Sequence, residues 1–179
     1  MKQELKLHPQ SRCSAVDRIE VDIDRLKADA ISLRYLVTGR ISKLRLPVPT
    51  KRVRADELWR HTCFEAFVQA LPGSAYLEFN FAPSTQWAAY AFSSYRTEMS
   101  VADTVPAPTI EIVTGVSSFE LRATLGGLGT GRAFRLGLSA VIEDTNGDTS
   151  YWALVHPPGK PDFHHSDCFA LEHPAAWTP

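Results

Sequence analysis

Alternation of apolar and polar residues dominates this chain and predicts β-strands. In the segment 18–24, Ile19, Val21 and Ile23 alternate with charged side chains. A strand turns successive side chains to opposite faces, so these three residues share one face. The same period of two recurs in three further series: Ile31, Leu33, Tyr35 and Val37; Phe119, Leu121, Ala123 and Leu125; and Phe134, Leu136, Leu138, Ala140 and Ile142.

Turn signals separate these runs and indicate antiparallel pairing. Asn146-Gly147 and the segment 71–74 (LPGS) each lie between two runs and favour tight hairpin turns. The Gly-rich segment 126–131 precedes another strand pattern, which predicts a third hairpin connection. We count about ten strand-like segments and one short helical turn, at 55–60. The sequence therefore predicts an all-β protein, an antiparallel β-sandwich, with residues 1–179 forming a single domain.

Composition and charge exclude several classes of partner. The chain has 19 basic and 20 acidic residues and a formal net charge of -1, so we expect neither nucleic acid nor a membrane as partner. It has no apolar run long enough for a membrane helix, and its first residues lack the apolar core of a signal peptide. Its cysteines, Cys13, Cys63 and Cys168, are odd in number and widely spaced. They predict reduced thiols and a cytoplasmic location.

Two neighbouring runs carry polar residues where a simple sheet face does not need them. In the segments 62–70 and 75–82, Phe64, Ala66, Val68, Leu77, Phe79 and Phe81 are predicted to face the core. A hairpin between the runs then places Glu65, Glu78 and Asn80 together on the opposite face, beside Phe67 and Tyr76. Such a face could hydrogen-bond sugar hydroxyls while its rings stack on the sugar. The alternative is an outer sheet face wetted by solvent.

Several short motifs resemble the DOMON-like superfamily, over roughly residues 16–173. They are LWRHTCFEAF at 58–67, YLEFN at 76–80, WAAY at 87–90, YWA at 151–153 and PDFHH at 161–165. That superfamily includes the family 9 carbohydrate-binding modules and haem-binding cytochrome domains. The resemblance implies a jelly-roll-like β-sandwich with a ligand site on or above one sheet.

The resemblance also implies site residues. Trp59 and Phe163 match the two aromatic positions that clamp a sugar ring in the carbohydrate-binding members, although Phe163 replaces a Trp. An arginine common in those members is absent from the strand of Glu78 and Asn80, and Arg96 or Arg60 would substitute for it. The predicted ligand-binding set is Trp59, Glu65, Tyr76, Glu78, Asn80, Arg96, Phe163 and His164. We expect non-catalytic binding of a small polar ligand, a carbohydrate or glycoside. A competing interpretation makes Trp59 an ordinary core residue.

Other chemistries compete for the same residues. Haem-binding relatives use a Met and a His as axial ligands, for which Met99 and one of His156, His164 and His165 are available. With Cys168 and His173, these histidines crowd the C-terminus and suggest a haem- or metal-binding redox accessory domain as the alternative function. Their spacing fits no standard closed zinc site, so we expect no cofactor, with haem or a structural calcium left open. Glu65 and Glu78 could also form a glycosidase pair, but the sequence marks neither as a proton donor, and we expect no enzyme.

Overall fold

The computed structural model describes residues 1–27, 29–128 and 133–174, and these residues form an all-β, antiparallel fold. Its twelve described strands are β1 (Lys2–Leu7), β2 (Val16–Lys27), β3 (Ala30–Gly39), β4 (Cys63–Ala70), β5 (Tyr76–Phe81), β6 (Trp87–Phe92), β7 (Ser100–Val101), β8 (Thr109–Thr114), β9 (Ser118–Leu125), β10 (Phe134–Glu143), β11 (Thr149–Ala153) and β12 (Leu171–His173). Three short 3-10 turns, η1 (Ile41–Lys43), η2 (Leu58–Arg60) and η3 (Ser166–Cys168), complete them. The helical turn predicted at 55–60 corresponds to η2.

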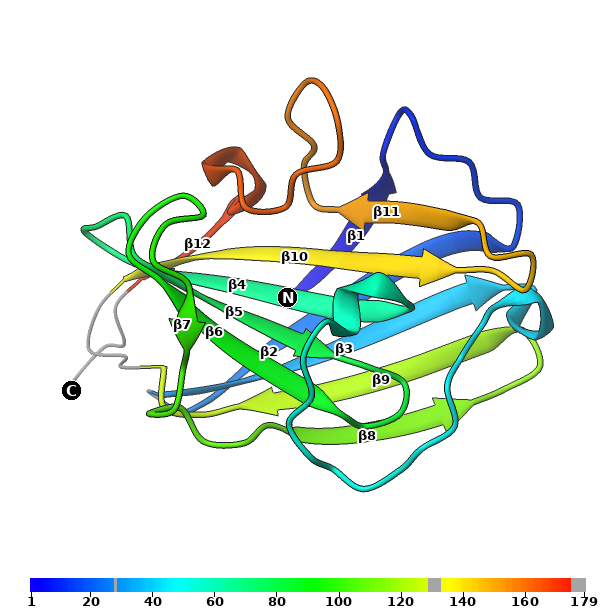
Figure 1. Ribbon diagram of the computed structural model, residues 1–179, viewed down its shortest axis with the longest axis horizontal. Coiled ribbons are helices and arrows are strands. Elements are labelled where there is room, and N and C mark those ends of the chain that lie inside the picture. Colours follow the sequence, from blue (N-terminus) through cyan, green and yellow to red (C-terminus); the bar gives the residue numbers. More distant parts are fainter. Residues whose placement is uncertain (28, 129–132, 175–179) are drawn as a thin grey trace.

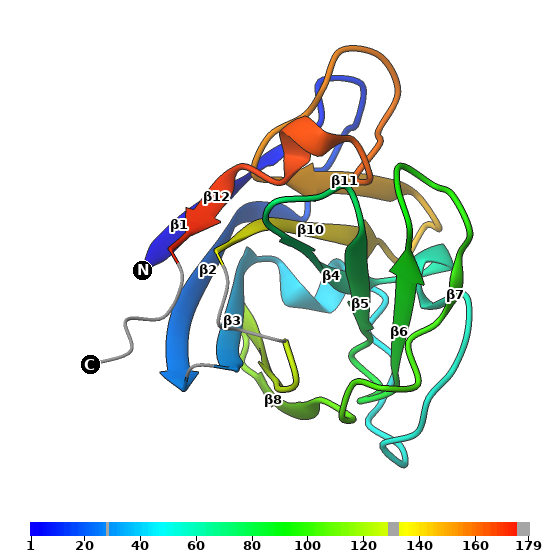
Figure 2. The same cartoon turned by 90° about the vertical axis from the view of Figure 1, so that its left-hand side faces the viewer.

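One continuous hydrogen-bonded path joins eleven of these strands, in the order β7-β6-β5-β4-β10-β11-β1-β2-β3-β9-β8. The twelfth, β12, pairs with β10. Strand β1 pairs with β2 on one side and with β11 on the other, so it connects the two halves of the path. The sheet curls, and its β2–β3 half lies across from its β4–β5 half (Figures 1 and 2). Among the described residues, no helix has both the length and the apolar character needed to span a membrane.

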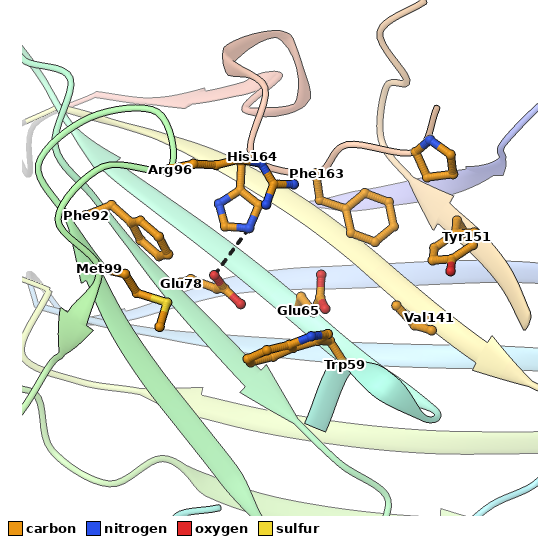
Figure 3. Close-up of a pocket in the computed structure, with 11 residues that line it drawn as sticks. Trp59, Glu65, Glu78, Phe92, Arg96, Met99, Val141, Tyr151, Phe163 and His164 are labelled. Carbon is orange, nitrogen blue, oxygen red and sulfur yellow. Dashed lines mark ion pairs between the residues drawn. The ribbon is translucent and has the colours of Figure 1, made fainter. Parts of the chain in front are cut away.

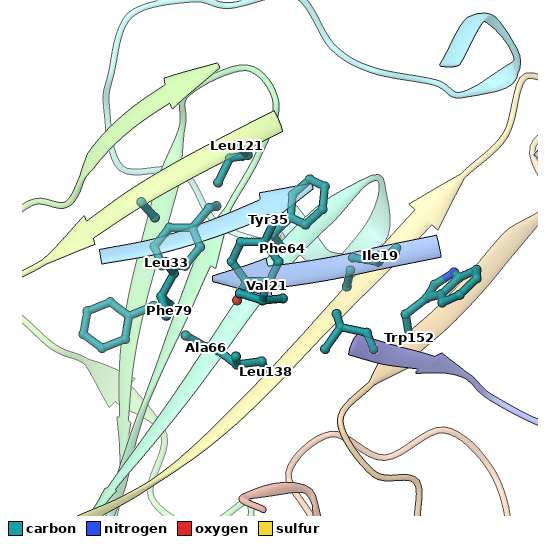
Figure 4. Packing of buried hydrophobic residues seen from close by; sticks show 14 of the residues in the cluster. Ile19, Val21, Leu33, Tyr35, Phe64, Ala66, Phe79, Leu121, Leu138 and Trp152 are labelled. Atoms are coloured by element: carbon teal, nitrogen blue, oxygen red, sulfur yellow. The ribbon is translucent and has the colours of Figure 1, made fainter. Parts of the chain in front are cut away.

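The curled sheet encloses the main hydrophobic core (Figure 4). The alternating residues face inward as predicted: Ile19, Val21, Leu33, Phe64, Phe79, Leu121, Leu136 and Leu138 are each at most 1% exposed. Leu77, also predicted to be core, is only partly buried. Phe64 of β4 stacks on Phe119 of β9, with ring centroids 5.8 Å apart. Such contacts join the two halves because each half turns its apolar face toward the other.

Two of the three predicted hairpin connections are confirmed. The segment 71–74 joins β4 to β5, and Asn146-Gly147 joins β10 to β11, with Gly147 at a φ of 89° that favours glycine. The third, at 126–131, is wrong in its partners and lies partly outside the described residues. Strand β9 pairs with β3 and β8, whereas β10 pairs with β4, β11 and β12, so this segment joins strands in different halves of the sheet.

Candidate binding site

The face of β4, β5 and β10 that points away from the main core carries a second apolar cluster. It contains Phe67, Tyr76 and Phe169, and Phe67 stacks on Phe169 with ring centroids 5.6 Å apart. Phe169 follows η3, in the segment after β11. Gly137 of β10 permits this close packing, because a Cβ there would lie only 2.7 Å from Phe169 Cδ1. The segment after β11 is therefore held against the sheet and covers part of its outer face.

A cavity of about 390 Å3 opens between this segment, the sheet and η2. It is lined by Trp59, Glu65, Glu78, Phe92, Arg96, Met99, Val141, Tyr151, Pro161, Phe163 and His164. Figure 3 shows Trp59 on one side and Phe163 with His164 on the other, with Glu65 and Glu78 between them. The structure thus brings six of the eight sequence-predicted residues to one cavity.

The aromatic residues of the predicted clamp come from two loops. Trp59 lies in η2, is only partly buried and contacts the Tyr90 ring edge-on, with centroids 5.9 Å apart. It therefore lies outside the main core, and its interpretation as an ordinary core residue is wrong. Phe163 is 9% exposed and packs near Tyr151 and His156, with centroids 6.1 and 6.3 Å away. These contacts hold Phe163 at the cavity wall.

Glu65 is a buried carboxylate on β4. It is 3% exposed, and its Oε2 accepts a hydrogen bond of 2.9 Å from Ser139 Oγ. The pairing of β4 with β10 sets Ser139 directly opposite Glu65, so the sheet register makes this contact. Burial, and then the neighbouring Glu78 carboxylate, raise the pKa of Glu65 to about 8.

Glu78 and Asn80 lie on β5 beside Glu65 and are also buried. Glu78 is 5% exposed, and its Oε1 accepts a hydrogen bond of 2.7 Å from Asn80 Nδ2. Burial raises the pKa of Glu78, against the opposing effects of Asn80 and Arg96. Asn80 is 0% exposed, and its Oδ1 accepts a hydrogen bond of 3.5 Å from Cys63 Sγ. These residues are therefore not a solvent-wetted face, because burial of this extent removes them from bulk water.

His164 connects the covering segment to the sheet. Its Nδ1 lies 2.8 Å from the Tyr76 hydroxyl, and its Nε2 lies 3.6 Å from Glu78 Oε2. Burial, and then the positive charge of Arg96, lower the pKa of His164 to about 4, so the ring is neutral at neutral pH. The Tyr76 hydroxyl accepts a hydrogen bond from the Arg96 backbone N–H at 3.2 Å and can donate its own proton to Nδ1. A neutral His164 then carries its proton on Nε2, facing Glu78.

Arg96 contributes charge to the cavity edge, but Asp162 neutralises it. Its Nη2 lies 2.8 Å from Asp162 Oδ1, and the Tyr95 hydroxyl donates to Asp162 Oδ2 at 2.6 Å. Although burial acts to raise the pKa of Asp162, these hydrogen bonds and the Arg96 charge keep it below its usual value. The Arg96–Asp162 pair thus remains ionised beside the two glutamates.

The two remaining predicted residues, Tyr76 and Asn80, do not line the cavity but hydrogen-bond to residues that do. Tyr76 is 3% exposed and holds His164, while Asn80 holds Glu78. Sequence reasoning did not assign Phe92, Met99, Val141, Tyr151 and Pro161 to the ligand-binding set, nor Ser139 and Asp162 that support it. For Ser139 and Val141 a signal existed, because both fall on the non-core face of the alternation in 134–142. Asp162 carries no such signal, since it lies in a loop.

The histidines predicted to crowd the C-terminus do not gather into a ligand set. Within the described ranges, no group of three or more His, Cys, Asp or Glu side chains is placed to hold a metal ion. His156 Nε2 lies 2.8 Å from the Lys6 carbonyl, and His165 Nδ1 accepts from the Asp167 N–H at 3.3 Å. Met99 lines the cavity with His164, but both His164 ring nitrogens face protein partners. The haem- or metal-binding alternative stays a prediction.

Comparison with known proteins reveals a similar fold. No protein-family model matches the chain, and no curated protein matches its sequence. The fold is similar to the crystal structure of a protein from Bacteroides uniformis described as a "putative carbohydrate-binding protein". The TM-score is 0.62, with 14% sequence identity, over 92% of this chain and 81% of that one. At this identity the likeness shows a shared fold.

Proposed function

We propose that this protein binds a small polar ligand, a carbohydrate or glycoside, in the cavity between Trp59 and Phe163. The observation that carries the proposal is the combination of aromatic walls with two buried carboxylates on the same cavity floor. Sugars present apolar ring faces that stack on aromatic side chains, and hydroxyls that donate to carboxylates.

The size of the cavity supports a ligand of one or two sugar rings. Pockets for small molecules range from about 300 to 1,000 Å3, and this cavity of about 390 Å3 lies near the lower limit. The floor is rigid, because Ser139 holds Glu65 and Asn80 holds Glu78. Such preorganisation reduces the entropy lost on binding.

Two further observations support the finer assignment. The described fold shares its overall arrangement with the Bacteroides uniformis protein, whose description names carbohydrate binding. The motifs around Trp59, Glu78 and Phe163 resemble the DOMON-like superfamily, so we assign the curled sheet to its jelly-roll-like sandwiches.

All three cysteines are unpaired, which supports a location in the reducing cytoplasm.

We propose that binding occurs without catalysis, and one observation favours glycoside hydrolysis as a second candidate. A carboxyl group whose pKa is raised to about 8 beside a second carboxylate is the arrangement that glycosidases use for general acid catalysis. Against it, one oxygen of each glutamate already accepts a hydrogen bond, from Ser139 for Glu65 and from Asn80 for Glu78.

A glycan array probed with fluorescently labelled protein tests the proposal. We expect binding to a restricted set of glycans, and we expect calorimetry to give dissociation constants between millimolar and micromolar for short sugars. Chromatography of the same sugars after long incubation then tests for hydrolysis. The absence of binding to every glycan would overturn the proposal, and release of monosaccharides would replace binding with hydrolysis.

A further inference from the structure

The charges around the cavity do not balance. Arg96 and Asp162 form an ion pair of 2.8 Å and cancel one another. Glu65 and Glu78 are 3% and 5% exposed and both line the cavity. Glu78 has His164 Nε2 at 3.6 Å, but burial and then the Arg96 charge lower the pKa of that ring to about 4 and keep it neutral at neutral pH. Among the described lining residues, the floor therefore carries two acidic groups, while Arg96 at the cavity edge is paired with Asp162.

Glu65 shows the imbalance most clearly. Among the residues that the structure describes, its carboxylate has the Ser139 hydroxyl as hydrogen-bond donor, and no Lys, Arg or His nitrogen lies within 4.0 Å of it. A buried carboxylate without a cation is destabilising, and proteins relieve this with a proton or with a bound positive charge. The raised pKa of Glu65 indicates that a proton fills this role when no cation is bound.

The walls of the cavity suit a cation as well as its floor does. Trp59, Tyr151 and Phe163 line it together with the two glutamates. The faces of aromatic rings attract ammonium groups, and this attraction strengthens where water is excluded. A neutral sugar would hydrogen-bond to the two glutamates but would leave Glu65 dependent on its proton, whereas an ammonium group would compensate the buried charge directly.

We infer that the ligand is an amino sugar, whose protonated amine is paired with Glu65 and Glu78 while its ring lies between Trp59 and Phe163. This inference rests on the proposed carbohydrate binding and names the chemical class of the sugar. On binding, the ammonium group takes the place of the proton on the glutamate pair, and that proton passes to solvent.

Calorimetry with three matched sugars tests the inference. Glucosamine carries the amine, N-acetylglucosamine carries the same nitrogen without charge, and glucose has a hydroxyl in its place. At about pH 7 we expect glucosamine to bind roughly ten- to a hundredfold tighter than glucose and N-acetylglucosamine, the range for a buried charge-assisted contact. Titration in two buffers of different ionisation enthalpy should show net proton release with glucosamine alone.

Variants of the two glutamates provide the control. Glu65→Gln and Glu78→Gln keep the size and the hydrogen-bonding oxygen but remove the charge. Each should therefore reduce the ratio of the glucosamine affinity to the glucose affinity toward one. Glu111→Gln removes the same charge from an exposed position on β8 and should leave the preference unchanged. Circular dichroism verifies that each variant is folded.

The possible outcomes separate this inference from the proposed function. If glucose or N-acetylglucosamine binds as tightly as glucosamine, the amino-sugar inference is overturned and carbohydrate binding stands. Choline serves as a cation without a sugar ring, and binding of choline but of no sugar would overturn carbohydrate binding and, with it, the amino sugar. A preference for glucosamine that persists in both glutamine variants would also overturn the inference.

Discussion

The Tyr76 hydroxyl and His164 Nδ1 lie 2.8 Å apart, although 88 residues separate them in the chain. This contact joins β5 to the segment that covers the cavity. It also sets which nitrogen of His164 points at Glu78, because Tyr76 already accepts a hydrogen bond from the Arg96 backbone. The covering segment and the floor of the site are thus coupled through one side-chain pair.

This pair predicts the tautomer of His164. At about pH 7 the ring should be neutral with its proton on Nε2, because Nδ1 accepts from Tyr76. Long-range proton–nitrogen NMR spectra of labelled protein can distinguish the two tautomers. Tyr76→Phe should remove the hydrogen-bond donor to Nδ1 and produce a mixture of the two His164 tautomers. Tyr95→Phe should leave the tautomer unchanged, because that hydroxyl donates to Asp162 instead. An Nδ1-protonated ring in the native protein would contradict the assignment.

Trp59→Ala should weaken sugar binding at least about tenfold while preserving the fold. The ring contributes stacking at the cavity wall but is only partly buried, so its loss removes more binding than stability. Calorimetry with the tightest-binding array sugar measures the first effect, and urea denaturation measures the second. Trp59→Phe should retain much of the affinity, since it keeps a ring. Unchanged affinity in the alanine variant would remove Trp59 from the site.

Glu65 should make the free energy of unfolding fall as pH rises. Its pKa is about 8 in the folded protein and 4.5 when solvated, so between these values the native state holds a proton that the unfolded state has lost. Stability therefore decreases across this window. His164 acts in the opposite direction between about pH 4 and 6.5, because its folded pKa is lowered. The effect of Glu65 is clearest above that range.

The measurement compares variants between about pH 6.5 and pH 8. Urea denaturation should show the native protein losing roughly 2 kcal/mol relative to Glu65→Gln over this range. Glu111→Gln should follow the native protein. If the free energies of unfolding of Glu65→Gln and of the native protein change in parallel between these pH values, the raised pKa of Glu65 is wrong.

The three cysteines should differ in reactivity. Cys63 and Cys168 are 0% and 3% exposed, and burial raises the pKa of Cys63 well above its usual value and that of Cys168 to about 12. The reactive thiolate is therefore scarce at both. A thiol reagent should modify Cys13, which is partly exposed, before the other two. In denaturant, without a reducing agent, all three should react. Fewer than three free thiols would indicate a disulfide and an oxidising compartment.

The alternation of residues was sufficient to predict much of the local arrangement. It identified Ile19, Val21 and Phe64 as core residues, and the 71–74 turn placed Glu65 beside Asn80, which are directly paired in the structure. These features were predictable because strand period and turn chemistry are local properties of the backbone. The connection at 126–131 was mispredicted because a local pattern does not specify which distant strands will pair.

The character of the site depends on contacts that no local pattern encodes. The sequence by itself determined that Glu65, Glu78 and Asn80 share a face, since side chains in a strand alternate. Only the tertiary structure decided that this face is buried, because Phe169 packs against Gly137 and holds the covering segment on the sheet. The insertion of β10 beside β4 likewise brought Ser139 to Glu65 across 74 residues. Burial and non-local strand pairing follow from the packing of the whole chain, and they turn a polar strand face into a charged cavity.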